Sequence, residues 1–153
     1  MDVSLNFLMP SDPRCLAVVR AAVGELSSLC GLKDDECRGV TLAVDEALAN
    51  VIRHAYHGNL ERAIQVSCRA LADRLEFTVL DQGEPPDPGR LAPHPLDDLA
   101  LSGRGTHIIR TVMDDVCYER VPGGNQLRLS KRLAGKGQDP QEKEQRYEHR
   151  DAS

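Results

Sequence analysis

Hydrophobic and polar residues recur along most of the chain with the periods of strands and helices. Residues 3–7 alternate with a period of two, which is typical of a half-buried strand. Over residues 16–30 the apolar positions recur every three or four residues, and Ser11 or Asp12 can cap this segment while Gly31 ends it. The pattern predicts a strand followed by a long amphipathic helix.

A second helix is predicted by a similar pattern. Asp34 or Asp35 can cap it, and the apolar residues between positions 40 and 55 fall on one face. The residues His57-Gly58-Asn59 then break the pattern. We expect this helix to bury one stripe and to leave the other faces for polar groups.

The remaining pattern favours strands with one more helix. Residues 64–68 and 75–79 alternate and predict an antiparallel hairpin. Five prolines in residues 83–102 exclude a regular helix or ladder, so this segment is expected to be a long loop, either a lid or a linker. Helical spacing returns over residues 105–113, and residues 116–131 alternate on both sides of a glycine-rich turn.

The order of these elements predicts the fold class. Runs of strands and helices that do not alternate regularly favour an α+β fold, a two-layer sandwich of helices on a mixed, mainly antiparallel sheet. Residues 1–134 are expected to form this domain. Residues 135–153 are almost entirely polar, and we interpret them as a charged C-terminal tail.

Composition narrows the possible classes of function. The formal charge of −5 provides no basic footprint for nucleic acid or an acidic membrane surface. The sequence contains no apolar run of membrane-spanning length and no signal-peptide pattern at its start. Five widely spread cysteines without a CxxC pair argue against a disulfide framework and a zinc site. These features are typical of a cytoplasmic protein that binds neither nucleic acid nor membrane.

The second predicted helix carries a polar stripe. Glu46, Asn50, Arg53 and His57 follow one another at spacings of four, three and four residues. Such a stripe is often only a solvated face. However, asparagine is unfavourable inside a helix, and its amide oxygen suits a hard cation such as magnesium. A carboxylate one turn earlier can activate a hydroxyl group or a water molecule.

Two further segments contain residues that could bind a ligand. Asp81 stands at the end of a predicted strand, although an aspartate there can simply open a turn. Residues 102–106, Ser-Gly-Arg-Gly-Thr, lead into a predicted helix whose free N–H groups favour phosphate. The glycines can equally form a flexible lead-in.

In this order the three segments resemble the N, G1 and G2 boxes of the GHKL superfamily of ATPases and kinases. The resemblance spans residues 3–133 and is closest to the anti-sigma-factor serine kinases of bacterial partner-switching systems. It implies the Bergerat ATP-binding fold, with ATP and Mg²⁺ bound between the helical layer and the sheet.

The resemblance also implies roles for individual residues. Glu46 would be the general base or would orient the substrate hydroxyl, and Asn50 would coordinate magnesium. Asp81 would accept the adenine amino hydrogen, and Gly83 would let the base approach the backbone. The remaining expected nucleotide contacts are His54, Gly103, Arg104, Gly105 and Thr106, with the two glycines cradling phosphates.

The activity implied by the resemblance is that of an ATP-dependent protein serine/threonine kinase and anti-sigma factor. Such a protein phosphorylates a small antagonist (anti-anti-sigma) protein, sequesters a sigma factor or equivalent regulator, and can form a homodimer. Two alternatives share the same boxes: a nonenzymatic interaction module ordered by ATP, and a GHKL ATPase.

The chain departs from the family pattern at the base end of the expected site. Pro85 stands where the G1 box often has a second glycine. Asn125 and Gln126 lie near the place where relatives often have threonines that support a water beside adenine. The loop over residues 83–102 has no evident Thr-Thr-Lys segment.

Overall fold

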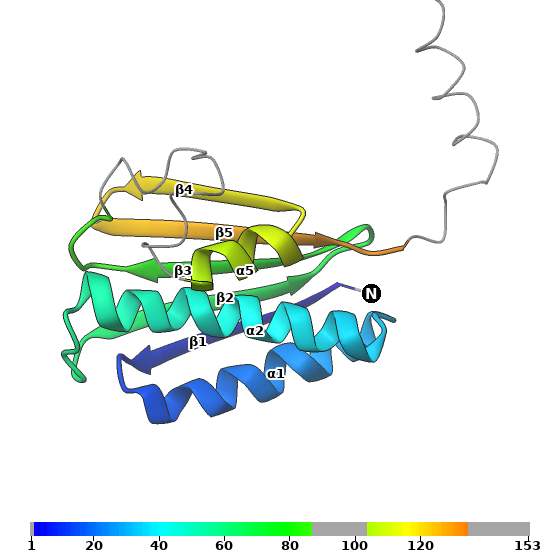
Figure 1. Cartoon of the computed structure of the whole chain (residues 1–153), viewed down its shortest axis with the longest axis horizontal. Helices are drawn as coiled ribbons and strands as arrows, with labels where there is room; N and C mark the ends of the chain where they lie inside the picture. Colours follow the sequence, from blue (N-terminus) through cyan, green and yellow to red (C-terminus); the bar gives the residue numbers. More distant parts are fainter. Residues whose placement is uncertain (1, 87–103, 135–153) are drawn as a thin grey trace, which may run out of the picture.

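The computed structural model describes residues 2–86 and 104–134, in which three α-helices lie over a five-stranded sheet (Figure 1). Predictions for residues 87–103 and 135–153 therefore lie outside the described residues. No helix in the described part of the chain is long and apolar enough to cross a membrane. The elements in chain order are β1 (Val3–Pro10), the 3₁₀ turn η1 (Pro13–Cys15), α1 (Leu16–Leu29), α2 (Asp34–Asn50), the π-helical turn η2 (Val51–Ala55), β2 (Ala63–Ala70), β3 (Arg74–Asp81), α5 (Arg104–Val112), β4 (Asp115–Val121) and β5 (Gly124–Arg132).

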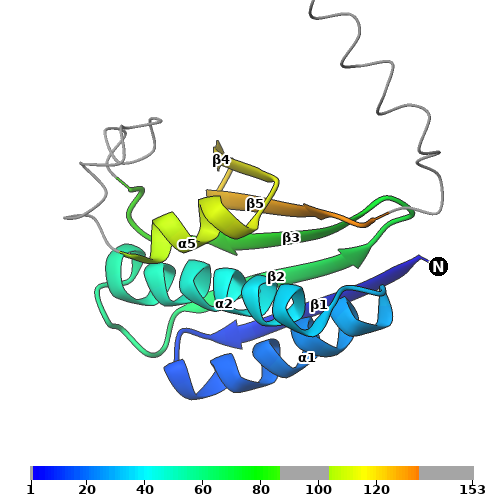
Figure 2. The ribbon, with the colours of Figure 1, turned by 45° about the vertical axis from the view of Figure 1, so that its right-hand side comes forward.

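The sheet forms one layer and the helices form the other. The strands pair in the order β1-β2-β3-β5-β4, and each of these four pairings is antiparallel. α1, α2 and α5 all cover the same face of the sheet, as the two views in Figures 1 and 2 show. The predicted α+β two-layer sandwich is confirmed, and among the described strands the sheet is antiparallel throughout.

The core lies between the two layers. Val40 and Val44 of α2 are almost completely buried, as are Leu75 and Phe77 of β3 and Leu129 of β5. These positions belong to the apolar stripe of the second predicted helix and to the inward-facing residues of the predicted strands. Burial of one face of each element therefore follows directly from the sequence periods.

The 3₁₀ turn η1, which leads into α1, begins at Asp12, one of the two expected caps, whereas α1 itself has Cys15 at its N-cap position without a side-chain hydrogen bond. The Asp12 carboxylate accepts a hydrogen bond from the Arg14 N–H at 2.9 Å. Ser11 does not cap the helix, because its buried hydroxyl donates to the Asn59 carbonyl at 2.6 Å and accepts from the Arg62 N–H at 2.9 Å. Ser11 instead joins the end of β1 to the segment before β2.

The predicted cap of the second helix was wrong by one or two residues. Lys33 occupies the N-cap position, and its N–H donates to the Glu36 carboxylate at 3.0 Å. Asp34 and Asp35 therefore lie inside the first turn. In that position both carboxylates face the positive end of the helix dipole, so the acidic cluster stabilises the helix without forming the cap.

The end of this helix is wider than a regular α-helix. α2 passes at Asn50 directly into the π-helical turn η2, which the sequence pattern did not predict. The helix then stops at the predicted break, where His57 and Gly58 have φ angles of 50° and 78°. A π turn takes more residues per turn, so side chains after Asn50 are rotated away from the positions of a regular helix.

Candidate functional site

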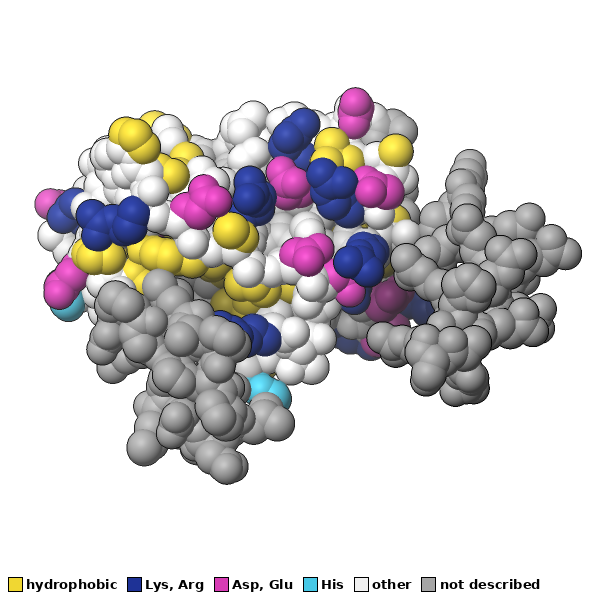
Figure 3. Space-filling model, turned by 90° about the horizontal axis from the view of Figure 1, so that it is seen from above, with side chains coloured by type: hydrophobic (Ala, Val, Ile, Leu, Met, Phe, Trp, Pro, Cys, Tyr) yellow, Lys and Arg dark blue, Asp and Glu magenta, His cyan; other side chains and the backbone are white. Residues whose placement is uncertain are grey.

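A cleft opens between the end of α2, the start of α5 and the sheet. Its volume is about 460 Å³, which is within the usual range for small-molecule sites. Asn50 and His54 line it from the long helix, Asp81 from β3 and Thr106 from α5. Seen from above in Figure 3, hydrophobic side chains gather in a hollowed strip, with Lys, Arg, Asp and Glu side chains mixed around it.

Four of the residues expected to form the site, Asn50, His54, Asp81 and Thr106, thus line one cavity. The other expected residues are not among those that the structure shows to line it. Gly103 lies outside the described residues, and Arg104 and Gly105 are described only as the first residues of α5. Glu46 does not line the cleft but lies one turn before Asn50 on the same helix. The fold therefore brings Asn50 of the N box and Asp81 of the G1 box close to the start of α5.

The polar stripe of α2 is a connected cluster over three of its four members. An Arg53 Nη2 donates to Asn50 Oδ1 at 3.2 Å and lies 3.6 Å from Glu46 Oε2. His57, the fourth predicted member, lies beyond the helix, and its Nε2 is 2.6 Å from Glu84 Oε2. His57 does not continue the stripe of α2, because the π turn between Asn50 and His57 breaks the regular helical spacing.

Asp81 lies at the inner end of the cleft, with 8% of its surface exposed. Its Oδ1 accepts from the Gly83 N–H at 2.8 Å and from Asn125 Nδ2 at 2.8 Å. Oδ2 makes no hydrogen bond to another described residue in this arrangement. The carboxylate is therefore held by one oxygen while the other is available as an acceptor.

Gly83 lies against the end of the helix. A Cβ atom at this position would be 2.4 Å from the Ala55 carbonyl oxygen, so no larger residue fits without moving the backbone. The next residue, Glu84, donates its N–H to the same carbonyl at 3.0 Å. The close approach for which Gly83 is required is thus to the helix end, and its expected contact with a base stays a prediction.

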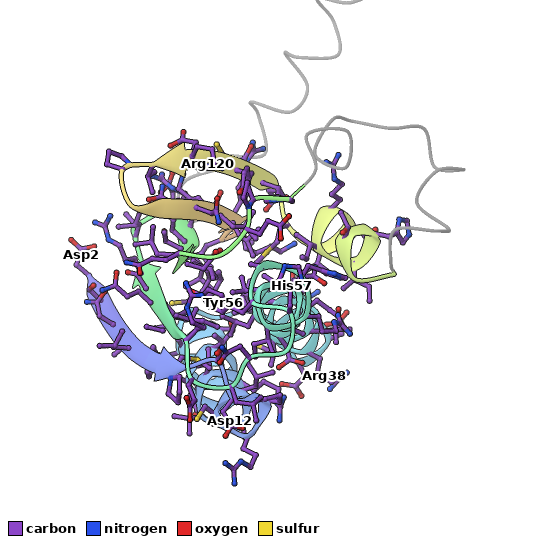
Figure 4. The ribbon with its side chains drawn as sticks, turned by 90° about the vertical axis from the view of Figure 1, so that its left-hand side faces the viewer. Asp2, Asp12, Arg38, Tyr56, His57 and Arg120 are labelled. Atoms are coloured by element: carbon purple, nitrogen blue, oxygen red, sulfur yellow. The ribbon has the colours of Figure 1, made fainter. Side chains whose placement is uncertain are left out.

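Tyr56 holds the loop after β3 in place, and the sequence analysis did not identify it. Its hydroxyl donates to the Ala63 carbonyl at 2.6 Å and accepts from the Gln82 N–H at 2.8 Å. The Arg62 guanidinium lies 4.6 Å from the ring centroid and also donates to the Gln82 carbonyl at 3.1 Å. Figure 4 looks towards the end of α2 and shows Tyr56 between this helix and the sheet, with His57 at the helix end.

Gly124 is a second residue that the sequence analysis did not identify. A Cβ atom here would lie 2.0 Å from the Asp81 carbonyl oxygen. The turn Pro122-Gly123-Gly124 was predicted, but its close packing against β3 depends on the antiparallel partner of Asp81, which is Asn125. A glycine at the start of β5 thus allows the two strands to meet beside the carboxylate.

Comparisons with known proteins support the resemblance carried by the sequence boxes. The family model for the histidine kinase-like ATPase domain matches residues 9–131. The serine-protein kinase RsbW of Bacillus velezensis is 29% identical over 134 residues, which cover 80% of this chain and 84% of that protein. RsbW of Bacillus pumilus is 31% identical over 123 residues, which cover 73% of this chain and 75% of that protein.

Solved structures show the same fold at lower sequence identity. A structure of the RsbU and RsbW domains of a Mycobacterium tuberculosis protein has a TM-score of 0.62 at 19% identity, and the match covers 86% of this chain and 32% of that chain. The histidine kinase domain of a blue-light activated kinase from Erythrobacter litoralis has a TM-score of 0.53 at 18% identity, covering 82% of this chain and 62% of that one.

Proposed function

We propose, on the premise that this chain belongs to the histidine kinase-like ATPase domain family, that it is an ATP-dependent protein serine/threonine kinase and anti-sigma factor. Its substrate is a small antagonist protein, and its second partner is a sigma factor or an equivalent regulator. The relatives named serine-protein kinase RsbW support a kinase of this type. The observation that carries the proposal is the buried Asp81 carboxylate, which leaves one oxygen as an acceptor in a cleft of nucleotide size.

Asp81 is the group that recognises the base. A carboxylate oxygen accepts a hydrogen bond from an exocyclic amine, and adenine presents such an amine where guanine presents a carbonyl. Because Asn125 and the Gly83 N–H hold Oδ1, the carboxylate cannot easily turn away from the cleft. An adenine nucleotide therefore gains a charge-assisted hydrogen bond, whereas a guanine nucleotide places two acceptors against each other.

The phosphates lie towards α5 in this proposal. Arg104 and Gly105 begin α5, and their backbone N–H groups stand at the positive end of a helix whose first turn contains no acidic residue. Gly103, which lies outside the described residues, is expected from the sequence to contribute to the same phosphate contact. Thr106 and His54 line the cleft and can donate to phosphate oxygens. The site is therefore expected to bind the anionic part of ATP mainly through donors and a helix dipole.

Magnesium fits the donor set at Asn50. The described residues contain no cluster of three His, Cys, Asp or Glu side chains that could hold a metal by themselves. Magnesium, however, commonly uses few protein oxygens together with substrate phosphates and water. Asn50 Oδ1 is such an oxygen, and its present donor is the exposed Arg53 guanidinium, which can exchange into water at little cost. Bound there, the ion would neutralise charge that develops on the phosphates.

Glu46 is the proposed catalytic residue. Its carboxylate is 25% exposed, at the outer side of Asn50, where a substrate protein can reach it. There it would accept the proton of the attacking serine or threonine hydroxyl, and its nearest cation, the exposed Arg53 guanidinium at 3.6 Å, can give way to a docked substrate. This role requires the hydroxyl of a docked protein, so Glu46 contributes to transfer and not to nucleotide binding.

A phosphorylation assay tests the proposal. The purified chain is incubated with ATP, Mg²⁺ and a small antagonist protein captured from the source cell, and phosphoserine or phosphothreonine is located by mass spectrometry. We expect one phosphate per antagonist molecule and none when GTP replaces ATP. Nucleotide-dependent capture of both partners without phosphate transfer would instead identify an interaction module ordered by ATP.

A further inference from the structure

Two buried polar atoms near the cleft have no partner among the described residues. They are the Tyr118 hydroxyl of β4 and Asn125 Oδ1 of β5. Buried polar atoms in native proteins nearly always have a partner, and an exception next to a cavity points to a ligand or an ordered water. The Asn125 side chain has a structural role, because its Nδ2 donates to Asp81 Oδ1 and to the Gly83 carbonyl. No contact yet explains the Tyr118 hydroxyl.

The strand register puts Tyr118 on the same face as Asp81. Tyr118 pairs with Leu127 across β4 and β5, while Asp81 pairs with Asn125 across β3 and β5. Since Leu127 and Asn125 are two residues apart, all four side chains point towards the helices. Tyr118, Leu127 and Asp81 accordingly line one cleft.

The electrostatics agree with this placement. The pKa of Tyr118 is raised, first by burial of the hydroxyl and then by the negative charge of Asp81. Burial and a nearby carboxylate both keep the phenol protonated at neutral pH. The hydroxyl is therefore a hydrogen-bond donor that stands near the base-recognising carboxylate, and no described residue accepts its proton.

We propose that the Tyr118 hydroxyl is a second base-reading group, which donates a hydrogen bond to a purine ring nitrogen beside the exocyclic amine held by Asp81. This inference rests on the proposed nucleotide binding. In adenine the amine lies between N1 and N7, and both are acceptors that need a donor. Asn125 cannot supply one, because its amide nitrogen is already engaged and its free atom is an oxygen. Among the described sheet residues beside Asp81 in the cleft, Tyr118 is the one with a hydroxyl that can donate this hydrogen bond.

The test combines a variant with altered nucleotides. Tyr118→Phe removes only the hydroxyl, and 1-deaza-ADP and 7-deaza-ADP each replace one ring nitrogen by carbon. Affinities of both proteins for ADP and for both analogues are measured by calorimetry with Mg²⁺. We expect Tyr118→Phe to bind ADP roughly three- to tenfold more weakly than the unaltered protein. One analogue should show a similar loss with the unaltered protein and no further loss with the variant.

Cys117→Ala is the matched control. Cys117 precedes Tyr118 on β4 and pairs with Arg128, so its side chain lies on the opposite face. This variant also loses a single heavy atom and should bind ADP and both analogues as the unaltered protein does. A loss of similar size in Cys117→Ala would mean that β4 itself is disturbed, and it would overturn the role of the hydroxyl.

The remaining outcomes separate this inference from the proposed function. Equal ADP affinity in Tyr118→Phe, with unchanged penalties for both analogues, overturns the role of Tyr118 while nucleotide binding stands. Absence of ADP binding to the unaltered protein overturns both. The two analogues can also be measured with the unaltered protein alone, so the test does not depend on correct folding of Tyr118→Phe. If the unaltered protein binds ADP and both analogues with equal affinity, the inference is overturned.

Discussion

The two ends of the cleft are built in different ways. At the inner end Asp81 and Asn125 are buried and connected by a hydrogen bond of 2.8 Å, and the Tyr56 hydroxyl binds the Gln82 N–H of the adjoining loop to the helix end. At the outer end Glu46 and Asn50 share one exposed arginine through contacts of 3.6 and 3.2 Å. Breaking a buried hydrogen bond costs about 1–3 kcal/mol, whereas an exposed ion pair contributes about 0–1 kcal/mol. The inner end is therefore preformed, and the outer end is free to rearrange around its ligands.

The largest effect is expected for Glu46→Gln at the outer end. The substitution is nearly isosteric but removes the proton acceptor, so phosphate transfer should fall by about 10²- to 10⁴-fold. ATP affinity should stay within about twofold of the original, because only the transition state needs the base. Single-turnover transfer and calorimetric ATP binding measure the two quantities. Glu76→Gln on β3, which lies on the sheet face away from the helices, is the control and should leave both unchanged. Normal transfer by Glu46→Gln would remove Glu46 from the mechanism.

Asp81→Asn should produce the next largest effect, at the inner end. The amide oxygen can still accept from Gly83 and Asn125, and this fixes the amide nitrogen towards the cleft, donor against donor. We expect ATP affinity to fall by about 3 kcal/mol, roughly a hundredfold, with little change in melting temperature. The comparison between the two ends is contradicted if the variant binds ATP normally, or if the unaltered protein binds GTP as well as ATP.

Tyr56→Phe tests whether the inner end is held by its own hydrogen bonds. The change leaves the Gln82 N–H and the Ala63 carbonyl without their buried partner, so the free energy of unfolding should fall by about 1–3 kcal/mol. Urea denaturation measures this. Tyr118→Phe is a suitable control, since that hydroxyl has no partner among the described residues and its loss should not destabilise the nucleotide-free protein. Equal stability of the two variants would show that the loop does not depend on Tyr56.

The smallest effect is expected for Arg53→Ala at the outer end. Its side chain is 58% exposed, and its contacts with Glu46 and Asn50 compete with water. The free energy of unfolding should change by less than about 1 kcal/mol, and any change should shrink further in high salt. Affinity for Mg-ATP should not decrease, because Asn50 Oδ1 loses a competitor. A marked loss of stability on thermal melting would mean that the outer end is as firmly built as the inner end.

The sequence predicted those features that depend on local periodicity. The helices, the antiparallel strands and the position of Asp81 at a strand end follow from alternating or helical spacing. The same spacing placed Asn50 on the cleft side of its helix. It failed for His57, because a regular period was extended through a helix end that is in fact a π turn.

Tyr56, Gly124 and the pairing of Asn125 with Asp81 were beyond sequence reasoning for another reason. Each depends on a contact between segments that are far apart along the chain, such as Tyr56 with Gln82 or Asn125 with Asp81. An aromatic residue at a helix end and a glycine in a turn have ordinary local explanations. Only the register of the completed sheet shows what these residues hold in place.

That register has a consequence for the order in which the protein becomes functional during synthesis. β1 pairs with β2 across about sixty residues, and β3 pairs with β5, the last strand in the described part of the chain. Contacts between such distant segments form slowly, because the intervening chain must first be made and closed into a loop. The hydrogen bond between Asn125 and Asp81 cannot exist before residue 125 has left the ribosome. A nascent chain can thus assemble β1, β2, β3 and the first two helices while the proposed base pocket is still unfinished, so the proposed nucleotide binding would have to wait for the completion of the sheet.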